Sequence, residues 1–301
     1  MKTYEIKQVH GSTWYIDSPV IIPFYRLDES RCILLDTGTW HFREAMENTF
    51  EKYSMVPVGI LGTHTHYDHY GNAAYFKEKY GSITALPIGE AEMSRSIYGV
   101  KSYLFCFSVG QVIKDKKMQA IPCETDIIIR EDQEEVSLCG SVFKVIHTPG
   151  HSIDHISVIT PDGVCYAGDA LMCGHSLHAS KLPYAFHMEM SLMSLEKMRS
   201  IKSAYMILAH RGILKAPYDD IIDENIHVMN REIEHAADII NRQMTVEEIY
   251  AAIQKEMGLS TDTVEKALDL ERFLRPYLEH LIDRGSHVQT VKNGILCYGP
   301  A

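Results

Sequence analysis

The sequence predicts an α/β fold followed by a small helical C-terminal domain, and three observations predict it. The chain has 301 residues, which fits two domains because domains usually contain about 100–200 residues. Apolar segments typical of strands alternate with helical patterns as far as about residue 215, so both kinds of element are expected in one core. From about residue 217 apolar residues recur mainly at helical spacing, which indicates a separate helical part.

The N-terminal part of the chain alternates strands and helices. Apolar runs and period-two alternation predict strands over residues 4–9, 13–16, 32–35, 58–61 and 83–86. Helical spacing predicts helices over residues 42–53 and 73–79. Residues 91–124 are irregular and contain many aromatic residues. Because aromatic side chains are usually buried, we expect a packed insertion there, with an active-site lid or an oligomer contact as the alternatives.

The middle of the chain continues this alternation. Strands are predicted over residues 126–129, 142–147, 156–160, 164–167 and 205–208, and a helix over residues 191–202. No internal repeat and no low-complexity tract interrupts the pattern. These elements and the N-terminal ones therefore indicate one mixed domain that ends near residue 216.

The last third of the chain is expected to form a connecting helix and a winged-helix-like domain. Helices are predicted over residues 218–242, after Thr245, over residues 263–270 and up to about Arg284. Thr245 and Glu248 form a capping box, and Pro276 marks either the first turn of the last helix or a kink. Asn293-Gly294 is typical of a hairpin turn. The predicted domains are residues 1–216, 217–243 and 244–301.

Composition and charge argue against several classes of protein. No apolar run reaches the roughly 18 residues of a membrane-spanning helix, and the first residues lack the apolar stretch of a secretory signal. Seven cysteines without a Cys-x-x-Cys pair fit a reducing cytoplasm, which is the expected location. The formal net charge is −11, and residues 217–301 contain 16 acidic and 8 basic residues. This balance argues against nucleic acid as a partner.

The most informative segment is His64-x-His66-x-Asp68-His69, which follows the predicted strand 58–61. It places four potential metal ligands next to one another in the chain. In an extended segment alternate side chains project to the same side, so His64, His66 and Asp68 are expected to converge on one ion. His69 would then point toward a second ion. The alternative interpretation is a run of surface histidines.

Three later strands end in a similar way, with a ligand-type residue beside a glycine that permits a tight turn. These residues are His147 and His151 in His-Thr-Pro-Gly-His, Asp169 in Gly-Asp, and His210 in His-Arg-Gly. One such strand end would be a weak signal. Four in one chain predict a pocket at one edge of a sheet.

With these motifs the chain resembles the metallo-β-lactamase superfamily over residues 1 to about 215. The motifs are His-x-His-x-Asp-His, Thr-Pro-Gly-His, Gly-Asp and a late strand-end histidine, in that order. Asp36-Thr37-Gly38 is also similar to the family's early Asp-Thr-Gly element. The resemblance implies an αββα sandwich with a dinuclear metal site between loops at one edge.

The resemblance also implies an assignment of ligands to two ions. The first ion would be held by His64, His66 and His151, the second by Asp68, His69 and His210, and Asp169 would bridge both. His151 is assigned because the final histidine of Thr-Pro-Gly-His is the family ligand, which makes His147 structural. From the sequence alone an exchange of these two roles stays open.

Such a site would catalyse hydrolysis. Imidazole and carboxylate ligands without thiolate suit zinc, iron or manganese, and we expect two divalent ions, with zinc the default. A pair of ions lowers the pKa of a bridging water toward neutrality, and Asp68 would be the catalytic acceptor or relay for its proton. The expected substrate is a small thioester, ester or lactone. The alternatives are a phosphodiesterase or ribonuclease with the same metal geometry and, outside enzymes, a metal-binding regulatory protein.

Substrate contacts are expected after the bridging carboxylate. Gly168–Met172 is similar to the Gly-Asp-x-Leu-aromatic segment of hydroxyacylglutathione hydrolases, except that Met172 replaces the aromatic residue. The candidate contacts that follow are His175, His178, Tyr184 and His187, with a solvated surface loop as the alternative. A similar C-terminal extension occurs in a thioesterase- and nuclease-like branch of the superfamily. The C-terminal helices are therefore expected to cap the cleft or to form a homodimer contact.

Overall fold

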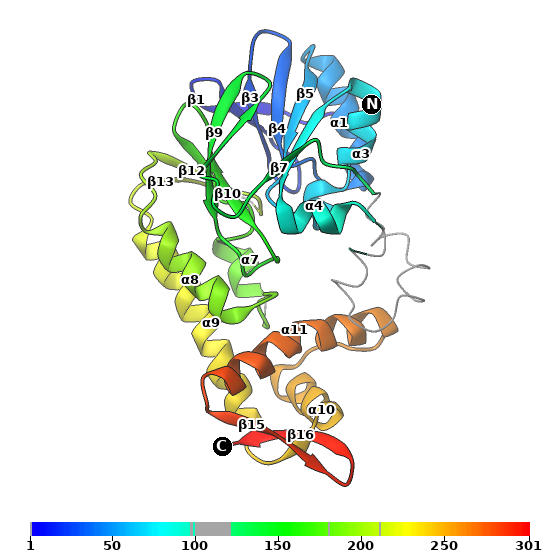
Figure 1. The fold of residues 1–301 in the computed structure, drawn as a ribbon, viewed down its shortest axis with the longest axis vertical. Coiled ribbons are helices and arrows are strands. Elements are labelled where there is room, and N and C mark those ends of the chain that lie inside the picture. Colours follow the sequence, from blue (N-terminus) through cyan, green and yellow to red (C-terminus); the bar gives the residue numbers. More distant parts are fainter. Residues whose placement is uncertain (1, 97–98, 100–121, 180, 211) are drawn as a thin grey trace.

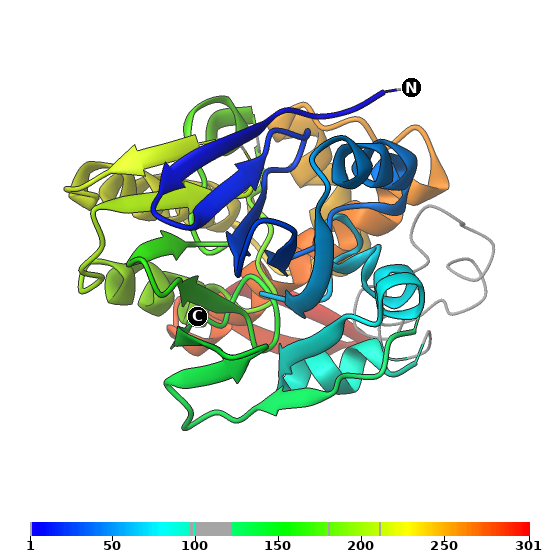
Figure 2. The ribbon, with the colours of Figure 1, turned by 90° about the horizontal axis from the view of Figure 1, so that it is seen from above.

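The computed structural model describes residues 2–96, 99, 122–179, 181–210 and 212–301. Two sheets pack face to face and helices cover their outer faces, with a helical part at the C-terminal end (Figures 1 and 2). The predicted αββα sandwich is thus confirmed. Most of the insertion at residues 91–124 lies outside the described residues, so its packed state stays a prediction.

The first sheet has seven strands in sequence order. They are β1 (Ile6–His10), β2 (Thr13–Ile16), β3 (Ile22–Arg26), β4 (Arg31–Leu35), β5 (Val56–Leu61), β6 (Ile83–Pro87) and β7 (Ile127–Ile129). Strands β4 to β7 are parallel neighbours. In β4, Cys32 and Leu34 pack against the helix layer, whereas Ile33 and Leu35 face the second sheet. This strand is a continuous apolar run because both of its faces are covered.

The second sheet has six strands in the order β13–β12–β11–β10–β9–β8. They are β8 (Glu135–Leu138), β9 (Ser141–His147), β10 (Ile156–Ile159), β11 (Val164–Tyr166), β12 (Tyr205–Leu208) and β13 (Gly212–Lys215). Phe143, Val158 and Ile207 from this sheet share one buried cluster with Ile33 and Leu61 from the first. That cluster is the core between the two sheets.

Helices form the outer layers. They are η1 (Trp40–Phe42), α1 (Arg43–Lys52), α2 (Tyr67–Tyr70), α3 (Ala73–Tyr80), α4 (Ile88–Ser94), α7 (Gly174–Ala179), α8 (Met188–Met198) and α9 (Asp219–Ile239). Met46 of α1 and Phe76 of α3 pack on the first sheet, and Leu195 of α8 and Ile222 of α9 pack on the second. Within the described part of the chain, no helix combines the length and apolarity needed to cross a membrane.

The C-terminal part contains two helices and a three-stranded sheet. The elements are β14 (Met244–Thr245), α10 (Val246–Met257), α11 (Val264–Asp283), β15 (His287–Lys292) and β16 (Ile295–Pro300), and the sheet order is β14–β16–β15. The capping box between Thr245 and Glu248 is confirmed, as is the hairpin, whose turn residues Asn293 and Gly294 both have positive φ. The winged-helix interpretation and the domain boundaries at residues 216 and 243 stay predictions.

Several elements differ from the sequence prediction, among them the short helices α2, α4 and α7, which were not predicted. The two helices expected between residues 263 and 284 are one helix, α11, which begins after the capping residue Thr263. Its buried face, with Leu274 before and Leu278 after Pro276, continues across the proline, so tertiary packing outweighs the lost hydrogen bond. Strands β3, β8, β13 and β14 were not predicted. Three of them, β8, β13 and β14, are sheet edges of at most four residues, too short for a clear periodic pattern.

Candidate metal centre

The predicted ligands lie on loops at the ends of four strands. His64, His66, Asp68 and His69 follow β5, His151 follows β9, Asp169 follows β11 and His210 follows β12. The segment after β5 does not stay extended, because His66 precedes the short helix α2, which contains Asp68 and His69. The expectation that alternation brings Asp68 toward His64 and His66 is therefore wrong. The helical turn directs Asp68 and His69 to a second group.

The first group consists of His64, His66 and His151, whose potential ligand atoms lie within 4.8 Å of one another. His66 Nδ1 lies 3.0 Å from His151 Nε2. His64 is fully buried, its Nδ1 contacts Thr63 Oγ1 at 3.0 Å, and its Nε2 has no hydrogen-bond partner among the described residues. A buried nitrogen without a partner is costly, and binding a cation would satisfy it.

The second group consists of Asp68, His69 and His210, again with ligand atoms within 4.8 Å of one another. Asp68 Oδ2 lies 3.8 Å from His69 Nε2 and 3.7 Å from His210 Nε2. These distances are longer than hydrogen bonds. They leave room for an ion between the three side chains.

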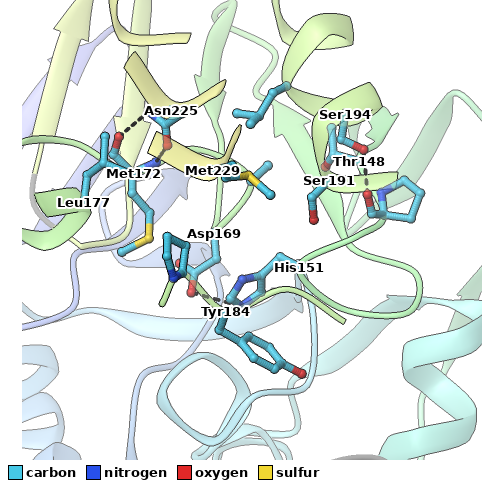
Figure 3. Close-up of a pocket in the computed structure, with 14 residues that line it drawn as sticks. Thr148, His151, Asp169, Met172, Leu177, Tyr184, Ser191, Ser194, Asn225 and Met229 are labelled. Carbon is cyan, nitrogen blue, oxygen red and sulfur yellow. Dashed lines mark hydrogen bonds and ion pairs between the residues drawn. The ribbon is translucent and has the colours of Figure 1, made fainter. Parts of the chain in front are cut away.

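Asp169 lies between the two groups. Its Oδ1 is 3.2 Å from His69 Nε2, and its Oδ2 is 3.2 Å from His210 Nε2 and 3.4 Å from His151 Nε2. Figure 3 shows this carboxylate next to His151. One side chain thus reaches nitrogens of both groups, which is the geometry that a bridging ligand needs. The donor set, imidazoles and carboxylates, fits two divalent cations.

The protonation of the first group favours metal binding. Burial and the neighbouring imidazoles lower the pKa of His64 and of His66. Burial also lowers the pKa of His151 to about 4, against the opposing effect of Asp169. Neutral imidazole is the form that binds a metal ion. At neutral pH these three side chains therefore need not lose a proton.

Charge pairing dominates around Asp169. Burial would raise the pKa of its carboxyl, but the imidazoles of His69 and His210 outweigh burial and hold this pKa well below its usual range. Conversely, burial would lower the pKa of His69, whereas the carboxylates of Asp169 and Asp68 raise it. Without bound ions, the imidazoles of His69 and His210 thus supply the positive charge that stabilises the Asp169 carboxylate.

Asp36 orients the second group. Its Oδ2 lies 2.9 Å from His69 Nδ1 and accepts hydrogen bonds from Thr63 Oγ1 at 2.8 Å and from the Tyr166 hydroxyl at 2.7 Å. Its Oδ1 accepts from the Thr63 backbone N–H at 2.7 Å. Because Nδ1 of His69 contacts Asp36, its Nε2 points at Asp169. Metal-ligating histidines are commonly oriented in this way, by a carboxylate at the other ring nitrogen. The sequence pointed to Asp36 through its Asp-Thr-Gly element but not to this role.

We expect Asp36→Asn to weaken binding of one ion about 10- to 100-fold, the usual cost of losing such a partner. The amide nitrogen of Asn cannot accept the hydrogen bonds that a carboxylate oxygen accepts, so His69 loses its fixed orientation. The unfolding free energy should also fall by roughly 1–3 kcal/mol, because a buried donor is left unsatisfied. Metal titration and urea unfolding measure the two effects. Asp17→Asn, at an exposed ion pair with Lys7, is the control and should leave both quantities unchanged.

His155 is a buried histidine that the sequence analysis missed. Its Nε2 accepts a hydrogen bond from the backbone N–H of Asp169 at 3.1 Å, and its Nδ1 lies 2.9 Å from Thr148 Oγ1. A Cβ at Gly168 would lie 2.6 Å from His155 Nε2, so glycine is required beside Asp169. His155 therefore positions the bridging carboxylate. The available signal was a second histidine four residues after His151.

The structure separates the two histidines of His-Thr-Pro-Gly-His. His151 lies in the first group, whereas His147 Nε2 lies 3.1 Å from the carbonyl oxygen of Gln133. The Nδ1 of His147 lies 3.7 Å from Asp154 Oδ1. Its partners are thus outside the metal centre, in agreement with the structural role that the resemblance implied.

Of the four predicted substrate contacts, the structure brings one to the centre. The ring of Tyr184 lies 5.7 Å from that of His66 and 5.4 Å from that of His151, between ring centroids. His178 instead contacts Glu224 at 2.7 Å, and His187 caps helix α8 by accepting from the Met190 N–H. One ring nitrogen of each is thus engaged away from the centre, and substrate contact by these two residues stays a prediction. The side chain of His175 lies outside the described residues.

A small cavity of about 50 Å³ adjoins the centre. It is lined by Thr148, Pro149, His151, Asp169, Ala170, Met172, Leu177, Pro183, Tyr184, Ser191, Ser194, Leu195, Asn225 and Met229 (Figure 3). Most of this lining is apolar, and Ser191 Oγ is a buried polar atom without a hydrogen-bond partner among the described residues. The volume suffices for a few water-sized groups.

The C-terminal part holds this side of the cavity in place. The Tyr277 hydroxyl of α11 donates to the carbonyl of Pro183 at 2.9 Å, and Phe273 packs on Tyr184 with ring centroids 5.1 Å apart. The guanidinium carbon of Arg272 lies 4.8 Å from the Tyr184 ring centroid. Helix α11 thus reaches the metal centre through Tyr184, the residue that contacts His66 and His151.

Relatives with curated descriptions match only part of the chain. A "Beta-lactamase-like protein 2 homolog" of Drosophila melanogaster is 25% identical over 200 residues, which are 64% of this chain and 59% of that protein. A hydroxyacylglutathione hydrolase of Wigglesworthia glossinidia brevipalpis is 24% identical over 185 residues, or 60% and 57% of the two chains. The chain thus spans less than two thirds of the length of these relatives.

Solved structures match more of the chain, at lower identity. A metallo-β-lactamase family protein from Thermus thermophilus has a TM-score of 0.71 at 19% identity, with 96% of this chain and 99% of that chain covered. A β-lactamase domain protein from Burkholderia ambifaria has a TM-score of 0.74 at 16% identity, with 99% and 94% covered. These likenesses show the fold. The family model of the metallo-β-lactamase superfamily matches residues 19–210, and the chain therefore belongs to this superfamily.

Proposed function

We propose that the protein is a dinuclear metal-dependent hydrolase of small acyl substrates, namely a thioester, ester or lactone. The observation that carries the proposal is the position of Asp169, whose two oxygens reach nitrogens of both ligand groups. His64, His66 and His151 would hold one ion, and Asp68, His69 and His210 the other. Zinc is the metal we expect, with iron and manganese as alternatives.

When bound, two divalent ions supply an activated water and a polarised substrate oxygen. The chain's own residues arrange the reaction. Asp68 Oδ2, 3.7–3.8 Å from the imidazoles of its group, is placed to accept the proton that the nucleophile gives up. Tyr184 and the apolar side chains of the cavity hold the acyl group beside Asp169 and exclude water from it.

Three observations favour an acyl substrate over a phosphodiester. The cavity beside Asp169 is mainly apolar, whereas a phosphodiester or an RNA would need basic side chains along its path. The chain has a net charge of −11. Among the relatives, the hydroxyacylglutathione hydrolases act by name on an acyl compound. Phosphodiesterase or ribonuclease activity is the second candidate because it uses the same metal geometry, and a metal-binding regulatory protein is the non-enzymatic one.

Metal analysis followed by parallel assays tests the proposal. We expect about two transition-metal ions per chain and turnover of an acyl-thioester or a lactone, with no turnover of a bis-aryl phosphodiester. Phosphodiester cleavage without acyl hydrolysis would reverse the ranking of the two enzymatic candidates. Protein that binds no transition metal under any loading condition would contradict both of them.

Helix α11 is proposed to cap the site, and Arg272→Ala tests this role. The Arg272 guanidinium carbon lies 4.8 Å from the ring centroids of both Tyr184 and Phe273, and such contacts contribute about 0.5–2 kcal/mol. The variant should loosen Tyr184 and raise KM roughly 2- to 30-fold, with kcat and metal content nearly unchanged. Arg275→Ala, which removes a contact to Glu271 on the same helix, is the control. A KM unchanged by Arg272→Ala contradicts the capping role.

The remaining proposals concern partners and location. A small-molecule substrate is proposed as the partner. The alternative to a capping role for the C-terminal part is a homodimer contact. The cytoplasmic location also stays a prediction, based on cysteine usage.

A further inference from the structure

Glu90 is a fully buried carboxylate that connects two loops of the metal centre. It lies on helix α4. Its Oε2 accepts hydrogen bonds from the backbone N–H and the hydroxyl of Thr65, at 2.9 and 2.7 Å. Its Oε1 accepts from the Ser152 hydroxyl at 2.6 Å and from the Asp154 N–H at 3.2 Å. Each oxygen thus serves one loop.

The two loops are those that carry the first group. Thr65 lies between His64 and His66, and Ser152 directly follows His151. These loops come from different sheets, since one follows β5 and the other follows β9. Their relative position sets the distance between His66 Nδ1 and His151 Nε2, which is 3.0 Å. The Glu90 carboxylate spans the boundary between the sheets next to this pair.

Helix α4 also donates a hydrogen bond to the loop that follows β9. The backbone N–H of Gly89 donates to Asp154 Oδ2 at 2.9 Å, while the N–H of Asp154 donates to Glu90. A Cβ at Gly89 would lie 2.8 Å from Cβ of Asp154, so the helix and the loop are in close contact. This contact fixes the position of Glu90 relative to the loop that follows β9.

Only a carboxylate meets the demands of this position. Four donors converge on it, and two of them are backbone N–H groups that cannot act as acceptors. Glutamine has one amide oxygen and places an NH₂ group where the second oxygen was. That NH₂ would face either the Thr65 N–H or the Asp154 N–H. At least one buried donor would then be left without its acceptor.

We propose that Glu90 is a positioning residue that sets the spacing of His64, His66 and His151 and thereby the affinity of the first metal site. The inference rests on the proposed metal centre. It assigns a function to a residue whose sequence context, an acid in the first turn of a short helix, is typical of helix capping. Residues that hold metal ligands in place usually contribute about 10- to 100-fold to metal affinity.

The test compares Glu90→Gln with Glu92→Gln in metal titrations. Glu92 lies on the same helix at an exposed ion pair with Arg95, so its variant is the matched control. Zinc affinities are measured by chelator competition, and the cobalt(II)-loaded proteins are compared by absorption spectroscopy. We expect Glu90→Gln to bind the ion of the first group about 10- to 100-fold less tightly and to change the cobalt spectrum. Glu92→Gln should match the wild type in both measurements.

Three results distinguish the possible failures. Unchanged affinity and spectrum in Glu90→Gln, even with a lower thermal stability, would overturn the inference and leave Glu90 a structural residue. If Glu90→Gln does not fold, Ser152→Ala replaces it, because it removes one of the four donors. That variant should lose affinity several-fold relative to Ser200→Ala, which removes an exposed hydroxyl contact, and equal affinities would overturn the inference. A wild-type protein that binds neither zinc nor cobalt refutes the proposed metal centre instead.

Discussion

Asp169→Ala is expected to lose at least one of the two ions and to abolish hydrolysis. The variant removes the carboxylate whose oxygens lie 3.2–3.4 Å from His69, His151 and His210. Without this carboxylate, no shared negative charge would offset the repulsion between the two cations. Loss of a single electrostatic stabiliser commonly costs about 10²–10³-fold in kcat, and removing a ligand to both ions should cost more. Metal analysis after dialysis and the acyl-hydrolysis assay measure the two losses.

Asp223→Ala is the control for this variant. Asp223 is an exposed carboxylate on α9 that pairs with Arg199, so its loss changes the net charge equally without touching the centre. It should retain two ions and full turnover. Full metal loading of Asp169→Ala would refute the bridging role. If turnover were lost in such a fully loaded variant, Asp169 would act in the reaction and not in metal binding.

His151→Ala is expected to cost far more activity than His147→Ala. His151 supplies Nε2 to the first group, 3.0 Å from His66 Nδ1, so its loss leaves that ion with two imidazoles. The partners of His147 are the Gln133 carbonyl and Asp154, outside the centre. We expect His151→Ala to lower metal stoichiometry and to reduce turnover to background, whereas His147→Ala should keep both within a few-fold. The reverse outcome would exchange the two assignments.

His147 should nevertheless affect stability in a pH-dependent way. The contact with Asp154 raises the pKa of His147 in the folded protein, and burial opposes this. A raised folded-state pKa means that the protonated side chain stabilises the fold. This contribution is complete below the unfolded value of about 6.5 and disappears as the pH rises through the raised value. In urea unfolding of metal-free protein, His147→Ala should therefore differ more from wild type at pH 5.5 than at pH 9.

The sequence predicted the strand ends well because their signals are local. A buried strand followed by a ligand and a glycine is encoded in about ten consecutive residues, and β5, β9, β11 and β12 all end this way. The seven proposed ligands could be named from these segments and from the family resemblance. Edge strands such as β8 and β13 were missed because each has only four residues, too few for a clear alternating pattern.

The grouping of the ligands depended on more than spacing. The alternation rule placed Asp68 with His64 and His66, but the chain turns into helix α2 at His66, and Asp68 instead lies with His69 and His210. A rule for extended segments could not foresee a helical turn of four residues. A similar limit applies to His178, whose partner Glu224 lies 46 residues away on α9 and is set by how α7 and α9 pack.

By itself, then, the sequence determined the fold class, the superfamily and the set of candidate metal ligands. Only the tertiary structure decided which of them meet and what holds them there: Asp36 behind His69, His155 behind Asp169, Glu90 between two loops, and α11 against Tyr184. The physical reason is the range of the interactions. Motifs follow from neighbours along the chain, whereas Glu90 and Ser152 are 62 residues apart and meet only because two sheets pack together.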